Sequence, residues 1–244
     1  EMVYTRHGNP KPGLDDEADA IVVAKSHFDL RWLFNDMKLT EAKLIELINE
    51  VLSEAALTPA ELPEGAHVTI EQVSEDEISI DYTDSNGKAF KYNTKGVPYG
   101  IVVMDTQVQM GDRLPCLNAM MIGFSDATSG WGPMLYDIAM EIATLKGGGL
   151  VSDRTMLSPA GYAIWDYYDK NRTDVEKIQL DNEHGEITPE IEDDDCLQST
   201  SYEWSKKKSI AWQESPISKI YRKQPTTLKS LGDKLILKDI NLTF

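Results

Sequence analysis

The sequence predicts an α/β (α+β) protein with a mixed, mostly antiparallel central sheet that is flanked by helices and followed by a C-terminal extension. Two observations lead to this class. A helical pattern of apolar residues near the N-terminus is followed by several segments in which apolar and polar residues alternate, between residues 67 and 124. Residues 132–168 then read as helix, strand and helix. Consecutive strands favour antiparallel pairing over a regular β-α-β array.

The N-terminal part begins with an arm at residues 1–18, which is rich in Pro, Gly and charged residues and is expected to be loosely held. The short apolar run Ala20–Ala24 is a candidate first strand. Thr40 is suited to cap a helix whose apolar stripe, at helical spacing, extends to Leu52.

A change to period-two alternation predicts strands at His67–Val73 and Ile78–Tyr82. Asp84–Gly87 is a turn of the hairpin kind, because its Asn-Gly pair tolerates positive φ. Two further strands are predicted at Tyr99–Met104 and Leu117–Phe124.

A glycine-containing turn, Ser129–Pro133, connects the last of these strands to an amphipathic helix. Pro133 suits the first turn of that helix, where its missing N–H would have no helical partner. Gly130 and Gly132 let the main chain approach a ligand without an intervening Cβ. The free N–H groups as far as Met134, together with the helix dipole, form a seat for a phosphate. Alternatively, the two glycines only shape the turn.

The helix is predicted to end at Lys146–Gly149 in a left-handed glycine cap. Leu150–Ser152 is a short strand. Ser158 and Pro159 then begin a second helix, as its N-cap and its first residue.

From Met120 to Lys170 the chain resembles the GCN5-related N-acetyltransferase (GNAT) superfamily. In that family a central strand leads into a Gln/Arg-x-x-Gly-x-Gly/Ala turn and a helix whose first amides hold the pyrophosphate of acetyl-CoA. The pantetheine arm lies in a splay between that strand and the next. Gly130-Trp131-Gly132 resembles the glycine turn, Leu150–Ser152 the second strand and Ser158–Tyr168 the second helix.

The resemblance implies a GNAT-like acyl-CoA-binding domain at residues 19–182 and acetyl-CoA as a substrate. The residues it implies as contacts of acetyl-CoA are Ser129, Gly130, Trp131, Gly132 and Met134. Arg154 is a further candidate, because it can supply a cation that the family turn has and this chain lacks at Ala127. Equally, Arg154 can cap a helix or pair with Asp153.

The family often has a Tyr in the second helix that protonates the leaving thiolate, and Trp165 stands at that spacing here. Tyr168 shares a helix face with Trp165 and is the candidate catalytic acid. The alternative for Tyr168 is an aromatic residue of the core. The sequence alone assigns no general base.

These features predict an acetyl-CoA-dependent N-acyltransferase whose acceptor is an amine on a small molecule or a protein. The alternative is a non-catalytic structural or interaction protein that keeps a GNAT-like fold, for example a phage-encoded one, since the chain also resembles such proteins. An acidic mimic of nucleic acid is a third hypothesis, based on net charge alone.

Charge divides the C-terminal part of the chain. Residues 183–199 are mostly acidic or polar and are predicted to be a solvated linker. Residues 200–244 carry nine Lys or Arg against four Asp or Glu, a net charge of +5 in a chain of net charge −17. This basic extension is expected either to dock on its own acidic protein or to contact a separate protein partner.

The composition also excludes several classes. No run reaches the ~18–20 apolar residues of a membrane helix, and the excess of acidic residues argues against a nucleic-acid-binding surface. The four histidines show no metal-ligand spacing, so no metal is expected. Cys116 and Cys196 are too few for a disulfide scaffold and fit a reducing compartment. We therefore expect a cytoplasmic protein, in the host cytoplasm or the virion if it is viral.

Overall fold

The computed structural model describes residues 56–92, 94, 97–105, 117–128, 130–153, 157–181, 187–191, 194 and 210–244. Several predicted features lie outside the described residues, namely the arm at 1–18, the strand at Ala20–Ala24, the helix that begins at Thr40, most of the acidic linker, and Ser129, Arg154, Cys116 and Cys196.

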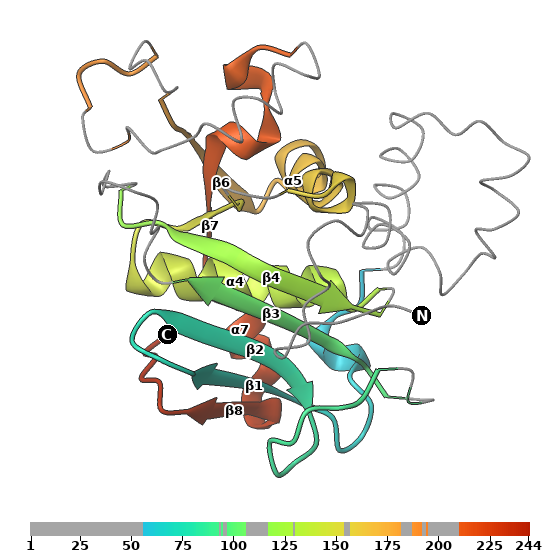
Figure 1. Cartoon of the computed structure of the whole chain (residues 1–244). Helices are drawn as coiled ribbons and strands as arrows, with labels where there is room; N and C mark the ends of the chain where they lie inside the picture. The colour runs from blue at the N-terminus through green and yellow to red at the C-terminus, as the bar shows by residue number, and fades with distance from the viewer. Residues whose placement is uncertain are drawn as a thin grey trace, which may run out of the picture.

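Within the described residues, eight strands form one sheet in the order β6-β7-β5-β4-β3-β2-β1-β8 (Figure 1). The strands are β1 (His67–Gln72), β2 (Glu77–Thr83), β3 (Gly100–Asp105), β4 (Met120–Ala127), β5 (Leu150–Val151), β6 (Val175–Gln179), β7 (Lys219–Lys223) and β8 (Leu235–Lys238). The pairs β4–β5 and β1–β8 are parallel and the others are antiparallel. The predicted class, a mixed and mostly antiparallel sheet, is confirmed.

The period-two pattern places the apolar side chains of β1 and β2 on one face of the sheet. Val68 lies opposite Tyr82, and Ile70 lies opposite Ile80. All four side chains are buried. Because residues that face each other across a ladder point to the same side, this face is apolar and needs a covering layer.

Helices supply that layer. The described helices are α4 (Gly132–Lys146), α5 (Pro159–Asn171) and α7 (Thr226–Leu231), with short 3-10 turns at η1 (Pro59–Glu61), η3 (Trp212–Glu214), η4 (Pro216–Ser218) and η5 (Gly232–Lys234). Figure 1 shows α4 and α7 behind the sheet and α5 above β4. Among the residues that the structure describes, no helix has both the length and the apolar character that crossing a bilayer requires.

The start of α5 follows the predicted pattern. Pro159 occupies the first helical position, and the Ser158 hydroxyl accepts a hydrogen bond from the N–H of Gly161 at 3.0 Å. Such an N-cap satisfies one of the amides that a helix leaves without an internal partner. This local prediction is confirmed.

The end of α4 differs from the prediction. The helix ends at Lys146, but the predicted left-handed cap is wrong, since Gly147 is extended with φ −162°. The glycines are needed here for another reason, because a Cβ atom would collide with neighbouring segments of the chain. A Cβ on Gly148 would lie 1.8 Å from the carbonyl oxygen of Leu117, and one on Gly149 would lie 2.5 Å from the Ile220 side chain. The run of glycines lets the chain pass between the turn before β4 and strand β7.

The core fills the space between the sheet and the helices. It includes a group of aromatic side chains that contact one another, among them Tyr136 on α4, Trp165 and Tyr168 on α5, and Tyr221 on β7. Trp165 meets the Tyr136 ring edge to face and lies 4.9 Å from the Tyr221 ring centre. These contacts hold α5 against α4 and the β7 side of the sheet.

The basic C-terminal residues belong to this sheet. β7 lies between β5 and β6, and β8 lies beside β1 at the edge, so the sheet continues across the predicted boundary at residues 183–199. Five basic side chains of this segment bond to earlier residues or to main-chain carbonyls nearby: Lys219, Arg222, Lys223, Lys234 and Lys238. The described part of the segment, residues 210–244, thus docks on its own protein, as in the first of the two alternatives.

A buried ion pair joins α4 to the C-terminal residues. Glu141 is fully buried in the middle of α4, and its carboxylate accepts hydrogen bonds from the ammonium of Lys223, which is 3% exposed. The same carboxylate accepts from the N–H groups of Thr227 (2.8 Å) and Leu228 (2.7 Å) in the first turn of α7. Lys223 also donates to the Thr226 hydroxyl at 2.8 Å. Every charge in this cluster is therefore compensated.

We expect Glu141→Ala to lower the free energy of unfolding by about 3–5 kcal/mol, because it removes the nearest carboxylate from the buried Lys223 ammonium, leaving only Asp137 at 3.7 Å, and leaves two amides of α7 without an acceptor. Chemical denaturation measures this loss. The matched control is Glu71→Ala, since Glu71 and Lys238 form an ion pair at 3.7 Å with 42% and 36% of their side chains exposed. That variant should change stability by less than about 0.5 kcal/mol. Equal losses would contradict a special role for Glu141.

Candidate functional site

The parallel strands β4 and β5 are neighbours for only a short distance. Two residue pairs join them, and the second is Met121–Val151. β5 then ends, while β4 continues to Ala127, and no described strand pairs with that part of β4 on its β5 side. We call this place the fork. It is formed by residues 122–127 of β4 and residues 152–153 after β5.

A β-bulge in β4 lies near the place where β4 and β5 separate, which we call the point of the fork. The register of the β3–β4 ladder shifts between Val103 and Met104, which leaves Gly123 as the extra residue on β4. Bulges bend a strand and increase its twist, which fits the separation of β4 from β5. The carboxylate of Asp105 lies over the bulge, since a Cβ on Gly123 would be 2.9 Å from one of its oxygens.

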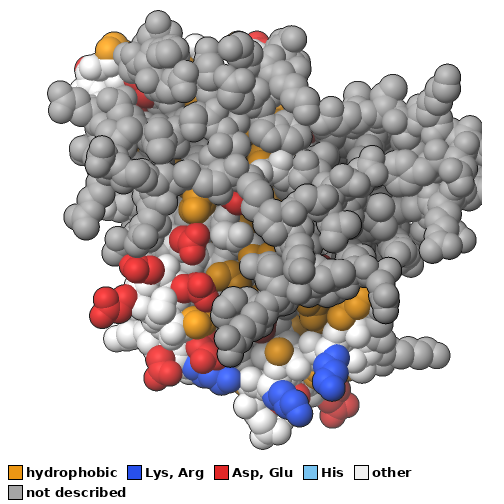
Figure 2. Space-filling view, in the orientation of Figure 1, with side chains coloured by type: hydrophobic (Ala, Val, Ile, Leu, Met, Phe, Trp, Pro, Cys, Tyr) orange, Lys and Arg blue, Asp and Glu red, His pale blue; other side chains and the backbone are white. Residues whose placement is uncertain are grey.

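Asp105 belongs to an acidic region on the sheet face that points away from α4. Figure 2 shows acidic side chains gathered on this face over the end of β3 and the beginning of β2. Burial raises the pKa of the Asp105 carboxyl above its ordinary value, and the carboxylates of Glu77, Asp153 and Asp76 raise it further. Asp105 is therefore easier to protonate than an ordinary aspartate.

The chain enters α4 through the predicted glycine turn. Gly130 has φ 84°, a conformation that favours glycine, and its carbonyl accepts a hydrogen bond from the N–H of Leu57 at 3.0 Å. The carbonyl of Trp131 accepts from the Tyr82 hydroxyl at 2.8 Å, and the Trp131 and Tyr82 rings meet edge to face. These contacts hold the turn against β2 and the segment before η1.

The N-terminal end of α4, which we call its amide end, lies beside Ala127, at the open end of the fork. The N–H groups of Gly132 and Met134, in the first turn, have no partner inside the helix, and no described residue accepts from them. There is room at this position, because a Cβ on Gly132 would meet only the Cβ of Ala127, at 3.6 Å. Free amides and the helix dipole make this end suitable for an anion.

The structure brings together four of the predicted contacts of acetyl-CoA at the start of α4, namely Gly130, Trp131, Gly132 and Met134. Met134 is only 2% exposed, and its side chain belongs to the core. The other two predicted contacts, Ser129 and Arg154, lie outside the described residues.

Tyr168, the predicted catalytic acid, lies inside the core. It is fully buried, and its hydroxyl lies within hydrogen-bond distance of two acceptors that share its one proton, the carbonyl of Pro133 (2.9 Å) and the carboxylate of Asp137 (2.8 Å). Burial and the Asp137 carboxylate raise the pKa of Tyr168 well above its ordinary value. These properties fit the alternative of a core aromatic residue. The role of catalytic acid stays a prediction.

Sequence reasoning missed four polar side chains at or beside the fork. The hydroxyls of Ser125 on β4 and Tyr136 on α4 hydrogen-bond at 2.9 Å. Ser152 follows β5 and is 1% exposed, and Asp105 lies over the bulge. The one signal in the sequence is a polar residue within or directly after an apolar strand, which many surface positions share.

Tyr136 connects α4 with β4 through its hydrogen bond with Ser125, and the Asp153 carboxylate after β5 influences its pKa. Burial raises the pKa of Tyr136 to about 12; the hydrogen bond with Ser125 lowers it, and the Asp153 carboxylate raises it. Because Asp153 acts on both Tyr136 and Asp105, the residues after β5 lie close to both groups. Among the described residues, no three His, Cys, Asp or Glu side chains are grouped so as to hold a metal ion.

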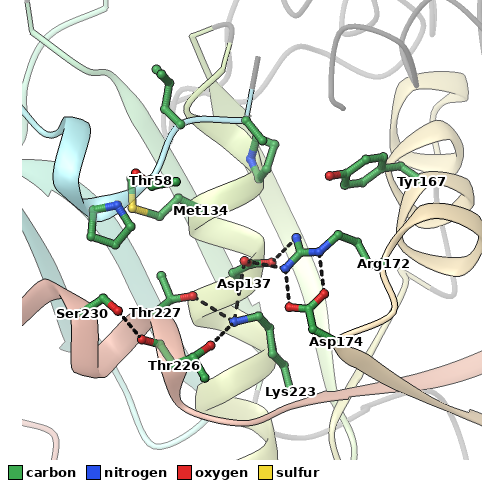
Figure 3. Close-up of a pocket in the computed structure, with 14 residues that line it drawn as sticks. Thr58, Met134, Asp137, Tyr167, Arg172, Asp174, Lys223, Thr226, Thr227 and Ser230 are labelled. Atoms are coloured by element: carbon green, nitrogen blue, oxygen red, sulfur yellow. Dashed lines mark hydrogen bonds and ion pairs between the residues drawn. The ribbon is translucent and has the colours of Figure 1, made fainter. Parts of the chain in front are cut away.

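A separate groove of about 410 Å³ runs along the first turns of α4 (Figure 3). Its lining includes charged and hydroxyl side chains from four elements: Asp137, Tyr167, Arg172, Asp174, Lys223, Thr226, Thr227 and Ser230. The Arg172 guanidinium bonds to both oxygens of Asp137, at 2.8 and 2.9 Å, and to both oxygens of Asp174, at 2.8 and 2.7 Å.

The cations of this groove are occupied by neighbouring side chains. Figure 3 shows Arg172 between Asp137 and Asp174, and Lys223 directed at Asp137, Thr226 and Thr227. The Arg172 hydrogen bond also holds the pKa of Asp174 below its ordinary value. These contacts tie α4, α5, β7 and α7 together and leave little charge for a ligand. We therefore take the fork, with the amide end of α4, as the candidate site.

Comparisons of the chain with protein-family models, with curated proteins and with solved structures give no match.

We expect Asp105→Asn to raise the melting temperature at pH 7. A carboxyl whose pKa is raised by folding stabilises the native state fully below about pH 4, and this contribution is lost as the pH rises through the folded-state pKa. The advantage of the variant should therefore vanish at pH 3.5. Melting curves of both proteins across this range test the expectation, and a difference that is independent of pH would contradict it.

We expect Tyr168→Phe to lower the free energy of unfolding by about 1–2 kcal/mol, because the Pro133 carbonyl loses a buried donor. Denaturant titration measures the change. Tyr92→Phe is a suitable control, since Tyr92 is 43% exposed and its hydroxyl is free to bond with water. Unchanged stability of Tyr168→Phe would contradict the structural role.

Proposed function

We propose that the chain is an acetyl-CoA-dependent N-acyltransferase of the GNAT type, which transfers an acetyl group to an amine on a small molecule or a protein. The observation that carries this proposal is the fork: a parallel strand pair that separates after two residue pairs, with the amide end of a long helix beside its open end. The GNAT resemblance at residues 120–170 assigns the pantetheine arm to such a place.

The fork is suited to an extended ligand that carries polar groups. The part of β4 from Ile122 to Ala127 has no described partner on its β5 side, so its main-chain N–H and C=O groups on that side can bond to a ligand. An extended chain with amide groups satisfies such an edge as an added strand does. The pantetheine arm of acetyl-CoA carries two amides, and its diphosphate would lie at the N–H groups of Gly132 and Met134.

The proposed reaction needs a proton acceptor and a polarised carbonyl. The neutral amine attacks the thioester carbon, the carbon–sulfur bond breaks, and the sulfur takes up a proton. Main-chain N–H groups at the fork would stabilise the carbonyl oxygen as its negative charge develops. The carboxylate of Asp105 lies over the bulge and is the candidate acceptor of the amine proton, since burial and its acidic neighbours make it more basic than usual.

A second candidate is a non-catalytic structural or interaction protein with the same fold. Two observations favour it: Ala127 stands where the family has Gln or Arg, and the Tyr168 hydroxyl is hydrogen-bonded inside the core. In either case we propose a cytoplasmic location, or the virion if the chain is phage-encoded. A protein partner at residues 200–244 remains part of the second proposal.

Acetyl-CoA at a hundredfold excess over its Kd should raise the melting temperature of the protein by about 5–10 °C, because a ligand of the native state stabilises it by mass action. Thermal unfolding with and without acetyl-CoA measures this shift. The absence of any shift at saturating concentrations would favour the non-catalytic candidate.

Substitution of Gly132 tests where acetyl-CoA binds. Gly132→Phe should abolish the shift, because its ring would occupy the space beside the free amides. Gly132→Ala is the matched control, since its Cβ would make only an ordinary contact with Ala127. That variant should fold and keep most of the shift. A full shift in Gly132→Phe would assign the ligand to another place.

A further inference from the structure

We propose that the hydroxyl of Ser152 is a binding group at the point of the fork, where it hydrogen-bonds to the acyl-thioester end of the ligand. This inference rests on the proposed function, and it concerns a residue that sequence reasoning did not select. The observation that carries it is a buried side-chain oxygen without a partner.

Ser152 is 1% exposed, and its hydroxyl oxygen is inaccessible to water and has no hydrogen-bond partner among the described residues. Several buried hydroxyls elsewhere are paired, for example in strands β1 and β2 and in the turn η4. Thr69 and Thr83 bond to each other at 2.8 Å, and Ser218 donates to the carbonyl of Ser215 at 2.7 Å. A buried hydroxyl without a partner costs about 1–3 kcal/mol. It is uncommon in folded proteins, and a site that awaits a ligand is one explanation.

The place of Ser152 in the fold points to the ligand rather than to a packing defect. It is the first residue beyond the last β4–β5 pair, Met121–Val151, and so stands where the two strands part. On β4, the bulge at Gly123 follows two residues after Met121, the last residue that pairs with β5. Ser215 also has an unpartnered hydroxyl, but it lies between η3 and η4 and is not part of the fork.

The length of the fork agrees with this assignment. From Ala127 to Ile122, β4 spans about 17 Å at the usual rise of a strand. The pantetheine arm has about a dozen bonds between its phosphate and its sulfur, or roughly 14 Å at the spacing of an extended chain. A ligand with its diphosphate at the start of α4 therefore brings its sulfur and acyl group to the point of the fork, beside Ser152.

The surroundings supply further polar groups for that end of the ligand. The Tyr136 and Ser125 hydroxyls bond to each other at 2.9 Å, and the carboxylate of Asp153 is close enough to Tyr136 to raise its pKa. The Ser152 hydroxyl has one donor and two acceptor positions. It can donate to the thioester carbonyl oxygen or to the sulfur, so Ser152 acts as a positioning residue and takes no part in bond making.

Ser152→Ala separates ligand binding from folding. Without ligand, the variant should be as stable as the natural protein or more stable, because it lacks a buried unpaired hydroxyl. Its Kd for acetyl-CoA should rise about tenfold, the effect of one hydrogen bond of ordinary strength. Its Kd for adenosine 3′,5′-bisphosphate, which has phosphates and no arm, should stay within twofold. Thermal melting and calorimetric titration measure these quantities.

The matched control is Ser218→Ala, which removes a buried but paired hydroxyl. It should lower the melting temperature and leave the Kd for acetyl-CoA unchanged. A similar fall in melting temperature for Ser152→Ala would mean that Ser152 has a structural partner, and would overturn the inference. Equal acetyl-CoA affinity of Ser152→Ala and the natural protein would overturn it too, while the proposed function stands. Failure of the natural protein to bind acetyl-CoA would overturn both.

Discussion

The arrangement of the molecule depends on one buried carboxylate. The carboxylate of Glu141, in the middle of α4, accepts hydrogen bonds from the ammonium of Lys223 at the end of β7 and from two main-chain N–H groups in the first turn of α7. A buried charge is tolerated only when its partners are in place, so this cluster fixes the C-terminal segment against the helix. Arg172 extends the same network from the end of α5 to Asp137, one turn before Glu141. The helix layer is thereby held in one position over the sheet.

This position of α4 determines what the fork can do. The helix begins directly beyond β4, and its free amides lie beside Ala127 at the open end of the fork. At the other end, the bulge at Gly123 lies under the Asp105 carboxylate. Two groups there are in states that lower the stability of the native protein: an aspartate with a raised pKa, and a serine hydroxyl that has no partner among the described residues. Such groups gather at binding and catalytic sites more than elsewhere.

Local signals in the sequence predicted several elements well. The alternation around Val68 and Ile80 predicted two strands of the sheet, and the Ser158-Pro159 pair predicted the first turn of α5. The turn from Gly130 to Pro133 predicted the start of α4. At the other end of that helix, the glycines indicated a left-handed cap. In the structure, they instead allow the chain to lie close to two other segments, the turn before β4 and strand β7. Such contacts between distant segments leave no local pattern.

The sequence by itself determined the class of the fold, the strands from β1 to β5 and the glycine turn, because periodicity, capping and turn chemistry act over a few neighbouring residues. The tertiary structure alone decided that β7 inserts between β5 and β6, that Tyr168 faces the core, and that Asp105, Ser125, Tyr136 and Ser152 lie at or beside one fork. The physical reason is that strand order and the burial of single polar groups follow from the packing of segments far apart in the chain, which hydrophobic spacing does not encode.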